Sequence, residues 1–469
     1  MIKNDLELSI SEENLAHFLS TLEGLEKDES IQELSPRKQE IYRKAIYGEV
    51  ENLQIQIQEY NKLKNEGINA IIIKEPTDLP QTIIKYRIAK GISESTLATR
   101  LGIEESELIE HEENLFVDAD NQLLKNLLNS LNIEVPHTLR ELLFNSEKVK
   151  RDLKTKLGSI FNRLVPFELK EEYNLLEGYL KLYSALQRIF GEQSNAILLG
   201  KQIDYSPVSV RYKVPNGLNS DTLYLHTSYA FHISKRITEI NDIPSKMLET
   251  DPNKFRKAII EKYGELNIEN CIQYVWHLGI PVLPLKLKGG FHAACWRIDG
   301  RNVIVLKQQS KSNARWLFDL LHEYWHATQE PHLLTRDVVD IQDVMSEGNK
   351  NQEELDANNF AADVIFDGRL EELLNKCVTL SNGRIQYLKR AVQSVATTNG
   401  IDVGALANQA AYYLSKSGGN WWGAAHNLQD KEDPFGIAYK VLGERINISE
   451  LEDPIDKELL ENALYEDVM

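Results

Sequence analysis

The residues best suited to chemistry are His322, Glu323 and His326, which form the pattern H-E-Y-W-H in a segment with helical periodicity. Side chains four positions apart project from one face of a helix, so two imidazoles at this spacing can hold one divalent ion at about 2.0–2.1 Å. Glu323 is turned roughly 100° around the helix from His322. Its carboxylate can therefore reach a zinc-bound water, whose pKa is near 7, without becoming a ligand. The pattern predicts a Zn²⁺ hydrolase site with Glu323 as the general base.

The alternative interpretation of the motif is a helix with two surface histidines and no metal. Five-residue matches of this kind also occur by chance on amphipathic helices. Phe318, Leu321 and Trp325 lie three and four positions apart, however, and this spacing indicates a helix that is buried on one side. Buried imidazoles and carboxylates need polar partners, and a metal ion supplies them.

A catalytic zinc ion usually has three protein ligands and one open position, so a third ligand is expected. One candidate is His332, which lies ten residues after His322, as in the metzincins. Metzincins have a glycine where this chain has Gln329, and that glycine allows the chain to turn back toward the metal. The other candidate is Glu354.

Glu354 lies in a segment, residues 351–365, that also has helical periodicity. Leu355 and Phe360 are expected to face inward in that helix, together with Ala361 and Val364. Asn358 follows Glu354 by four residues and shares its face. One of these two side chains can bind the metal while the other orients a ligating histidine.

The two motifs together resemble the ImmA/IrrE family of bacterial and phage zinc metallo-endopeptidases. About 28 residues after H-E-x-x-H, the stretch Glu354-Leu355-Asp356-Ala357-Asn358-Asn359-Phe360-Ala361 matches E-x-[DE]-A-N-x-F-A position by position. The resemblance covers about residues 270–370. It implies a gluzincin-like endopeptidase in which Glu354 is the third zinc ligand and Asp356 or Asn358 supports a ligating histidine. It also implies a regulatory protein substrate, such as a repressor or an antitoxin, that is cut in a stress or defence response. This chain departs from the family at Tyr324 and Trp325, where small or aliphatic residues are common, and the bulky pair is expected to reshape the cleft.

A second unit is predicted at residues 80–114, where Leu97-Ala98-x-x-Leu101-Gly102-Ile103 is typical of a helix-turn-helix. The unit resembles an XRE-type domain, and Glu112 matches the glutamate that this family has late in its third helix. Residues 80–115 nevertheless contain four basic and seven acidic side chains. Readout of the major groove needs basic or amide side chains at the front of the recognition helix. Protein recognition is therefore favoured over DNA binding. The alternative function is a non-enzymatic transcription regulator or antitoxin that binds a toxin or a promoter, with the zinc domain as sensor or scaffold.

Nearer the N-terminus, Ser35 and Pro36 suit the start of a long helix. Apolar side chains then recur at a 4-3-4-3 spacing, at Ile46, Val50, Leu53, Ile57 and Tyr60. This seam of about two heptads is expected either to pack within its own domain or to pair two copies in a homodimer.

The whole chain has 469 residues, 42% of them hydrophobic, and a formal net charge of −18, so as a whole it repels nucleic-acid phosphates and acidic membranes. Its three widely spaced cysteines fit a reducing compartment, and the buried interpretation of Cys295 is favoured over a reactive one. No apolar run approaches the length of a membrane span and no signal peptide is recognisable, so a cytoplasmic protein without a membrane partner is expected.

The expected fold is mainly α (α+β), with an N-terminal helical and helix-turn-helix region, a zincin-like domain with a small sheet, and a helical C-terminal region. The expected segments are residues 1–76, 77–136 (helix-turn-helix), 137–224, 225–378 (peptidase) and 379–469, the last with a mobile acidic tail. Strands are predicted at 208–214, 282–285, 291–297 and 302–306, with a hairpin turn at Asp299-Gly300. This hairpin is expected either to pair with an extended substrate as an edge strand or to be purely structural.

Overall fold

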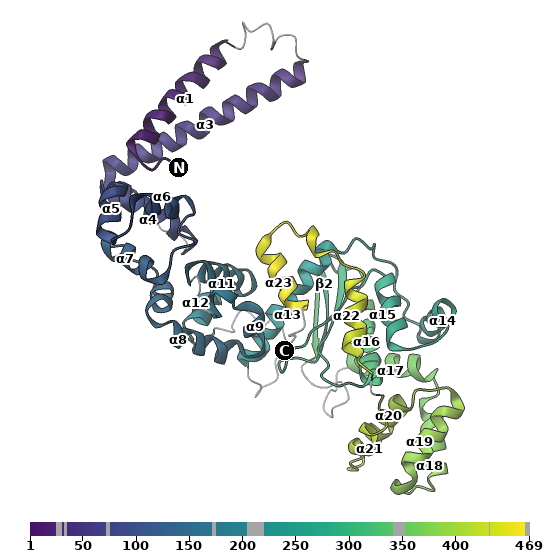
Figure 1. Cartoon of the computed structure of the whole chain (residues 1–469). Coiled ribbons are helices and arrows are strands. Elements are labelled where there is room, and N and C mark those ends of the chain that lie inside the picture. The colour runs from purple at the N-terminus through teal and green to yellow at the C-terminus, as the bar shows by residue number, and fades with distance from the viewer. Residues whose placement is uncertain are drawn as a thin grey trace. The chain divides into compact units, whose positions relative to one another are not determined.

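The computed structural model describes residues 1–24, 31, 35–71, 76–170, 175–203, 220–340, 352–430 and 432–464. These residues are mainly helical and include a small sheet, as the sequence predicts, and the sheet is mixed and has four strands (Figure 1). The chain divides into two compact units, residues 1–150 with 165–183, and residues 151–164 with 184–469. This division is coarser than the five expected segments, whose finer boundaries stay a prediction. The strand predicted at 208–214 lies outside the described residues.

Among the described residues of the first unit, the regular elements are all helices. Its helices, two of which (α8 and α11) continue past the limits of the unit, are α1 (Asp5–Gly24), α3 (Pro36–Glu66), α4 (Leu79–Ala89), α5 (Glu94–Leu101), α6 (Glu105–Glu113), α7 (Asn121–Leu131), α8 (His137–Leu157), α10 (Phe167–Lys170) and α11 (Leu175–Phe190). The two long helices α1 and α3 lie side by side (Figure 1).

The predicted apolar seam of α3 packs within the chain. Ile46 and Val50 are buried, and partly buried apolar side chains of α1, among them Leu15 and Phe18, cover them. Further along, the Tyr60 hydroxyl donates a hydrogen bond of 2.8 Å to Asp5 at the start of α1. The intramolecular alternative for the seam is therefore confirmed, and a homodimer stays a prediction.

Helices α4, α5 and α6 occupy the segment predicted as a helix-turn-helix. Ser93 caps α5 by accepting a hydrogen bond of 3.1 Å from the backbone N–H of Thr96. Gly102, at the predicted turn, has φ +74°, a left-handed conformation that glycine adopts without steric cost. The residues of the predicted pattern therefore form two helices joined by a tight turn.

A buried ion pair joins the first and third of these helices. The Arg87 guanidinium donates to both carboxylate oxygens of Glu112, at 2.7 Å for the Nη2 contact, and to Glu94 at 3.1 Å. Arg87 and Glu112 are only 2% and 1% exposed. Arg87 also donates to the carbonyl oxygens of Ile92 and Lys3, so it ties the N-terminal segment to α4. Both charged side chains are therefore buried and out of reach of a nucleic acid at the surface.

The second unit contains the sheet and the remaining helices. Its strands are β1 (Val282–Pro284), β2 (Ala293–Ile298), β3 (Arg301–Leu306) and β4 (Arg336–Asp340). Its helices are α9 (Phe161–Leu164), α12 (Ser194–Leu198), α13 (Ser220–Ile240), α14 (Pro252–Tyr263), α15 (Ile268–His277), α16 (Asn313–Thr328), α17 (Gln352–Phe366), α18 (Leu370–Leu380), α19 (Ile385–Asn399), α20 (Val403–Lys416), α21 (Trp422–His426), α22 (Pro434–Gly443) and α23 (Pro454–Leu464).

The predicted hairpin is present, and its turn has positive φ angles at Asp299 (+49°) and Gly300 (+81°), as a two-residue hairpin loop requires. The strand order is β1-β3-β2-β4, with β1 parallel to β3 and β2 antiparallel to both of its neighbours. The expectation that the hairpin supplies an edge strand is wrong, because β2 and β3 are each paired on both sides. Among the described strands, β1 and β4 are the edges. The sequence analysis missed β4, whose only apolar residues are Val338 and Val339.

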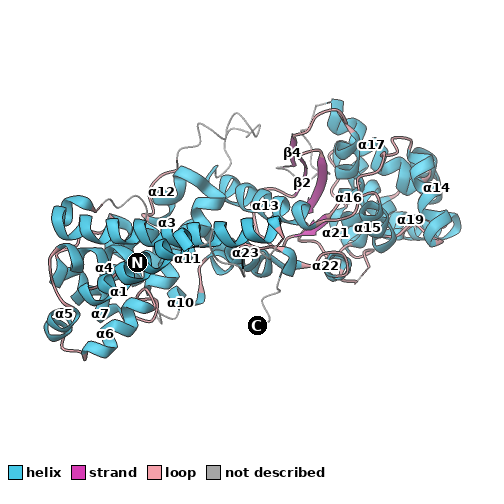
Figure 2. Cartoon of the chain, turned by 90° about the horizontal axis from the view of Figure 1, so that it is seen from above, coloured by secondary structure: helices cyan, strands magenta, loops and turns pink. Residues whose placement is uncertain are grey.

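Helices cover both faces of the sheet, as the side chains of β2 show. Trp296 contacts Phe231 of α13 edge to face at 5.6 Å. Its neighbour Arg297 points to the opposite face and donates a hydrogen bond of 2.8 Å to the carbonyl oxygen of Ala327 in α16. Every residue of β2 is accordingly buried. Figure 2 shows the strands among the surrounding helices.

The expected mobile acidic tail is wrong for residues 454–464, which form α23. Leu459 and Leu460 of this helix are buried. Asp456 accepts hydrogen bonds from His232 and Arg236 of α13, both at 3.0 Å, and Arg163 donates to the carbonyl oxygens of Asn462 and Ala463. Asp456 and the backbone carbonyls at the end of the helix therefore anchor α23 to its neighbours. No helix in the described ranges has both the length and the apolar composition that crossing a lipid bilayer requires.

Candidate metal centre

Helix α16 carries the H-E-x-x-H residues through the core of the second unit. Ser312 caps the helix by accepting a hydrogen bond of 3.2 Å from the backbone N–H of Arg315. Thirteen of its sixteen residues are buried, including His322, Glu323 and His326 at 0% exposure. This excludes the interpretation of His322 and His326 as surface histidines. A helix buried on nearly all sides places its polar side chains where each needs a partner.

The two bulky residues within the motif, Tyr324 and Trp325, differ in burial. Tyr324 is fully buried and packs on Phe255 and Phe360, with ring centroids 4.4 and 5.8 Å away. Its hydroxyl donates to the carbonyl oxygen of Glu249 at 3.2 Å and accepts from the backbone N–H of the same residue at 3.0 Å. Tyr324 is therefore a core residue, and the expectation that the pair reshapes the cleft stays a prediction. Trp325 is half-buried and packs on Phe360 at 5.4 Å.

The structure brings His322, His326 and Glu354 together from α16 and α17. The two Nε2 atoms lie 3.1 Å apart. The Glu354 carboxylate lies 3.2 Å from Nε2 of His322 through one oxygen, and 3.5 Å from Nε2 of His326 through the other. Among the described residues, these three form a group of side chains that could hold a metal ion.

These distances fit a tetrahedral ion. Two ligands at about 2.0–2.1 Å from a tetrahedral zinc are separated by about 3.3–3.4 Å, and the three measured separations of 3.1, 3.2 and 3.5 Å bracket this value. Three nitrogen and oxygen donors also leave a fourth position, as catalytic zinc sites require. The donor set therefore suits Zn²⁺.

The other nitrogen of each imidazole faces an oxygen acceptor, and this determines the tautomer. Nδ1 of His322 lies 3.2 Å from the amide oxygen of Asn358, and Nδ1 of His326 lies 2.8 Å from the carboxylate of Glu353. Each Nδ1 therefore carries the proton, and each Nε2 presents a lone pair. Two lone pairs and a carboxylate converging on one point repel one another unless a cation lies between them.

The predictions for α17 divide in the structure. Glu354 joins the cluster. Of the two side chains predicted to support a ligating histidine, Asp356 and Asn358, it is Asn358 that contacts His322. Asp356 accepts a hydrogen bond of 2.9 Å from Gln352 in its own helix, away from the histidines. Leu355 is 44% exposed, so its predicted inward position is wrong. The other three positions predicted to face inward, Phe360, Ala361 and Val364, are buried, as is Ala357, because the face opposite Leu355 packs on α16 and α14.

His332 lies outside the cluster, in the exposed turn after α16. The chain turns at Glu330, which has φ +45°, and then continues into β4. Glu354 thus occupies the position that His332 would have taken in a metzincin-like site. The roles of the residues as metal ligands stay predictions.

The Glu323 carboxylate lies near enough to the buried Cys295 thiol to affect its ionisation. Burial and the nearby Glu323 carboxylate raise the pKa of the Cys295 thiol well above its usual value. A thiol in this state is a poor nucleophile, which fits the interpretation of Cys295 as an ordinary buried cysteine. Cys271 and Cys377 are also buried.

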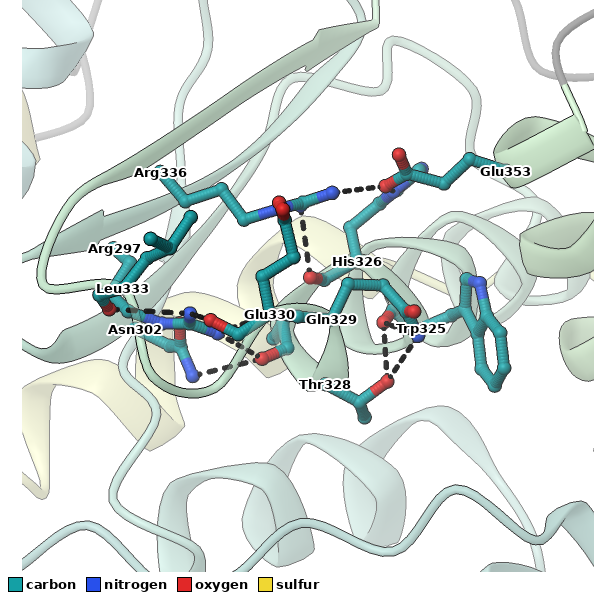
Figure 3. A network of polar contacts seen from close by, with 11 residues as sticks. Arg297, Asn302, Trp325, His326, Thr328, Gln329, Glu330, Leu333, Arg336 and Glu353 are labelled. Carbon is teal, nitrogen blue, oxygen red and sulfur yellow. Dashed lines mark hydrogen bonds and ion pairs between the residues drawn. The ribbon is translucent and has the colours of Figure 1, made fainter.

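Sequence reasoning missed two arginines that organise the end of α16 (Figure 3). Arg297 of β2 donates hydrogen bonds to the carbonyl oxygens of Ala327, Gln329, Glu330 and Leu333, which lie at and beyond the C-terminus of the helix. These carbonyls have no partner inside the helix, and a guanidinium also interacts favourably with the negative end of the helix dipole.

Arg336 of β4 donates to the His326 carbonyl oxygen at 3.1 Å and forms ion pairs with Glu330 and Glu353. Its partners lie 10, 6 and 17 residues away along the chain. The sequence signal for this network is the pair of acidic residues, Glu353 and Glu354, at the start of a helix. The pair alone does not indicate which of the two carboxylates contacts Nδ1 of a histidine.

No family model, no curated protein and no solved structure matches the chain. The residues and their geometry are therefore the evidence for what this centre does.

Proposed function

We propose that the chain is a zinc-dependent endopeptidase that cleaves a regulatory partner protein, such as a repressor or an antitoxin, in a stress or defence response. The observation that carries the proposal is the convergence of Nε2 of His322, Nε2 of His326 and the Glu354 carboxylate at separations suited to one tetrahedral ion. The class of substrate follows from the resemblance of the two motifs to the ImmA/IrrE family.

Each residue of the centre has a distinct role in this proposal. His322, His326 and Glu354 hold the metal, and the contacts from Asn358 and Glu353 orient the two imidazoles. When bound, zinc supplies a Lewis acid and a water of lowered pKa. Glu323 accepts the proton of the attacking water and then donates it to the leaving amine. Its complete burial keeps this carboxylate apart from bulk water before substrate arrives.

An extended substrate would pair with β4. The hairpin strands β2 and β3 cannot accept another strand, since each is already paired on both sides. Among the described strands near α16, β4 has a free side, and its Arg336 contacts the backbone of His326. Addition of a strand to such an edge supplies backbone hydrogen bonds without requiring a particular side-chain sequence.

The test is incubation of the zinc-loaded chain with proteins encoded by neighbouring genes, followed by mass spectrometry of the products. The proposal predicts one new pair of termini in one partner, which is lost with a chelator and with Glu323→Gln. Cleavage by Glu323→Gln at the same site and rate, or failure of the zinc-loaded chain to cleave any of these proteins, would count against it.

The alternative is a non-enzymatic regulator or antitoxin whose helix-turn-helix-like part binds a protein. The observation that favours a protein over DNA is the surface of α6, where five glutamates are exposed: Glu104, Glu105, Glu107, Glu110 and Glu113. Arg87 is buried in its ion pair and Lys85 pairs with Glu59, which leaves Lys90 and Arg100 as the basic residues between 80 and 115 for phosphate contacts. An electrophoretic mobility shift on promoter DNA, with salt-dependent affinity, would support the promoter version of this alternative.

A further inference from the structure

The guanidinium of Arg336 lies between an exposed turn and the candidate metal centre. Its Nε donates to Glu330 at 3.1 Å, its Nη1 donates to the carbonyl oxygen of His326 at 3.1 Å, and its Nη2 pairs with Oε1 of Glu353. The Arg336 side chain is only 11% exposed. All three nitrogens are therefore engaged, and the planar fork of the guanidinium fixes the direction of each hydrogen bond.

The oxygen of Glu353 that pairs with Arg336 also accepts the hydrogen bond from Nδ1 of His326 at 2.8 Å. Arg336, Glu353 and His326 thus form a chain of contacts that joins β4 to α17 and α17 to α16. Figure 3 shows Arg336 in contact with both the Glu353 carboxylate and the His326 carbonyl oxygen. A carboxylate on the outer nitrogen of a ligating histidine fixes its ring and raises its basicity.

Glu353 lies where its carboxylate could compete with Glu354 for the metal ion unless another residue holds it. Glu353 directly precedes the candidate ligand Glu354, and its side chain is 36% exposed, so it has room to move. An unrestrained carboxylate beside a divalent ion is itself a good ligand, and a fourth protein ligand would fill the position that catalysis needs open. The two adjacent glutamates must therefore be kept in different roles.

We propose that Arg336 is a positioning residue of the metal centre, which holds the Glu353 carboxylate on Nδ1 of His326 and away from the ion. Glu354 is then the ligand and one coordination position stays open. This inference builds on the proposed zinc site and adds that an arginine on the edge strand controls its coordination number.

Cobalt substitution tests the inference in the full-length chain, because Co²⁺ occupies zinc sites and its visible absorption reports coordination number. Four-coordinate Co²⁺ absorbs several-fold more strongly than five- or six-coordinate Co²⁺. In Arg336→Gln, we expect the absorbance per bound cobalt to fall at least about two-fold, because Glu353 loses the guanidinium that holds its carboxylate away from the ion. In the double variant Arg336→Gln/Glu353→Gln, we expect the absorbance to return to that of Glu353→Gln alone. Glu353→Gln should itself weaken zinc binding by about 10- to 100-fold.

The matched control is Glu330→Gln, which removes the other carboxylate that pairs with Arg336 but contacts neither histidine. Its cobalt spectrum and zinc affinity should equal those of the wild type. If Arg336→Gln does not fold by circular dichroism, Arg336→Lys keeps the charge without the fork and should give an intermediate absorbance.

Three outcomes would overturn the inference. They are an Arg336→Gln or Arg336→Lys spectrum that equals the wild type, a double variant that stays as weak as Arg336→Gln, and a Glu353→Gln variant with unchanged zinc affinity. If the wild-type chain still binds the metal in these cases, the proposed zinc site is unaffected and only the role of Arg336 is rejected. Failure of the wild-type chain to bind Co²⁺ or Zn²⁺ would instead remove the proposed function, and the inference with it.

Discussion

Replacement of Arg87 by methionine should destabilise the first unit strongly and leave the second unit unchanged. Arg87 is 2% exposed, and it makes two hydrogen bonds to Glu112 and one to Glu94. The substitution leaves the Glu112 carboxylate, itself 1% exposed, without its cation. Removal of one partner of a buried ion pair costs about 3–5 kcal/mol, mostly because the remaining charge stays desolvated. We expect about 4 kcal/mol here, because Glu94 also loses a contact.

The distribution of tryptophans allows the two units to be followed separately. All six tryptophans of the chain lie between residues 276 and 422, in the second unit. Tryptophan fluorescence therefore reports the unfolding of the second unit, and far-ultraviolet circular dichroism reports both units. With a urea dependence of about 2 kcal/mol per molar, the first unit of Arg87→Met should unfold about 2 M earlier than in the wild type.

A control and a double variant make this prediction specific. Arg100→Met changes an exposed arginine of α5 and should change the free energy of unfolding by less than about 0.5 kcal/mol. Adding Glu112→Met to Arg87→Met removes the isolated charge and should restore part of the lost stability. The reasoning is refuted if Arg87→Met unfolds like the wild type by circular dichroism, if the fluorescence transition shifts as far as the dichroism transition, or if the double variant is no more stable than Arg87→Met.

Three further predictions concern the second unit. Glu323→Gln should retain about one zinc ion per chain but lose cleavage, because an amide cannot accept the proton of the attacking water; metal analysis beside a cleavage assay checks this. Tyr324→Phe removes the hydroxyl that hydrogen-bonds to the Glu249 backbone and should lower the free energy of unfolding by about 1–2 kcal/mol, measured by fluorescence. The zinc content should stay that of the wild type, and a variant that loses its zinc would contradict a purely structural role. Burial lowers the pKa of Lys307 to about 7, below its unfolded value of 10.5. Between these pH values the unfolded chain therefore binds more protons than the folded chain, and the free energy of unfolding should rise from pH 7 toward pH 10. In Lys307→Met this rise should be absent. An identical pH dependence in Lys307→Met would show that Lys307 does not cause the rise.

Local patterns in the sequence predicted the elements that depend on local chemistry. Asp299-Gly300 predicted the hairpin turn because both residues tolerate positive φ angles, and Gly102 predicted the turn before α6 for the same reason. The spacing of His322 and His326 placed both imidazoles on one helical face. The match around Glu354 indicated which distant carboxylate approaches them.

Features that depend on tertiary contacts could not be predicted in this way. Strand order decides which strand is an edge, and no residue of β4 marks it as the partner of β2. Leu355 faces solvent because the packing of α17 on its neighbours, and not its own hydrophobicity, orients the helix. The contacts of Glu353 with Nδ1 of His326 and with Arg336 join residues of three separate elements, which no local pattern indicates. The acidic composition of residues 454–464 concealed a helix that is held by arginines and a histidine.

The most direct test of the metal centre is the zinc content of the purified chain after loading and extensive dialysis, measured beside Glu354→Gln by inductively coupled plasma mass spectrometry. Three converging ligands predict about one zinc ion per wild-type chain and a large loss in the variant, since removal of the carboxylate leaves only the two imidazoles of His322 and His326. A wild-type chain without zinc, or a Glu354→Gln chain that retains as much zinc as the wild type, would contradict the account.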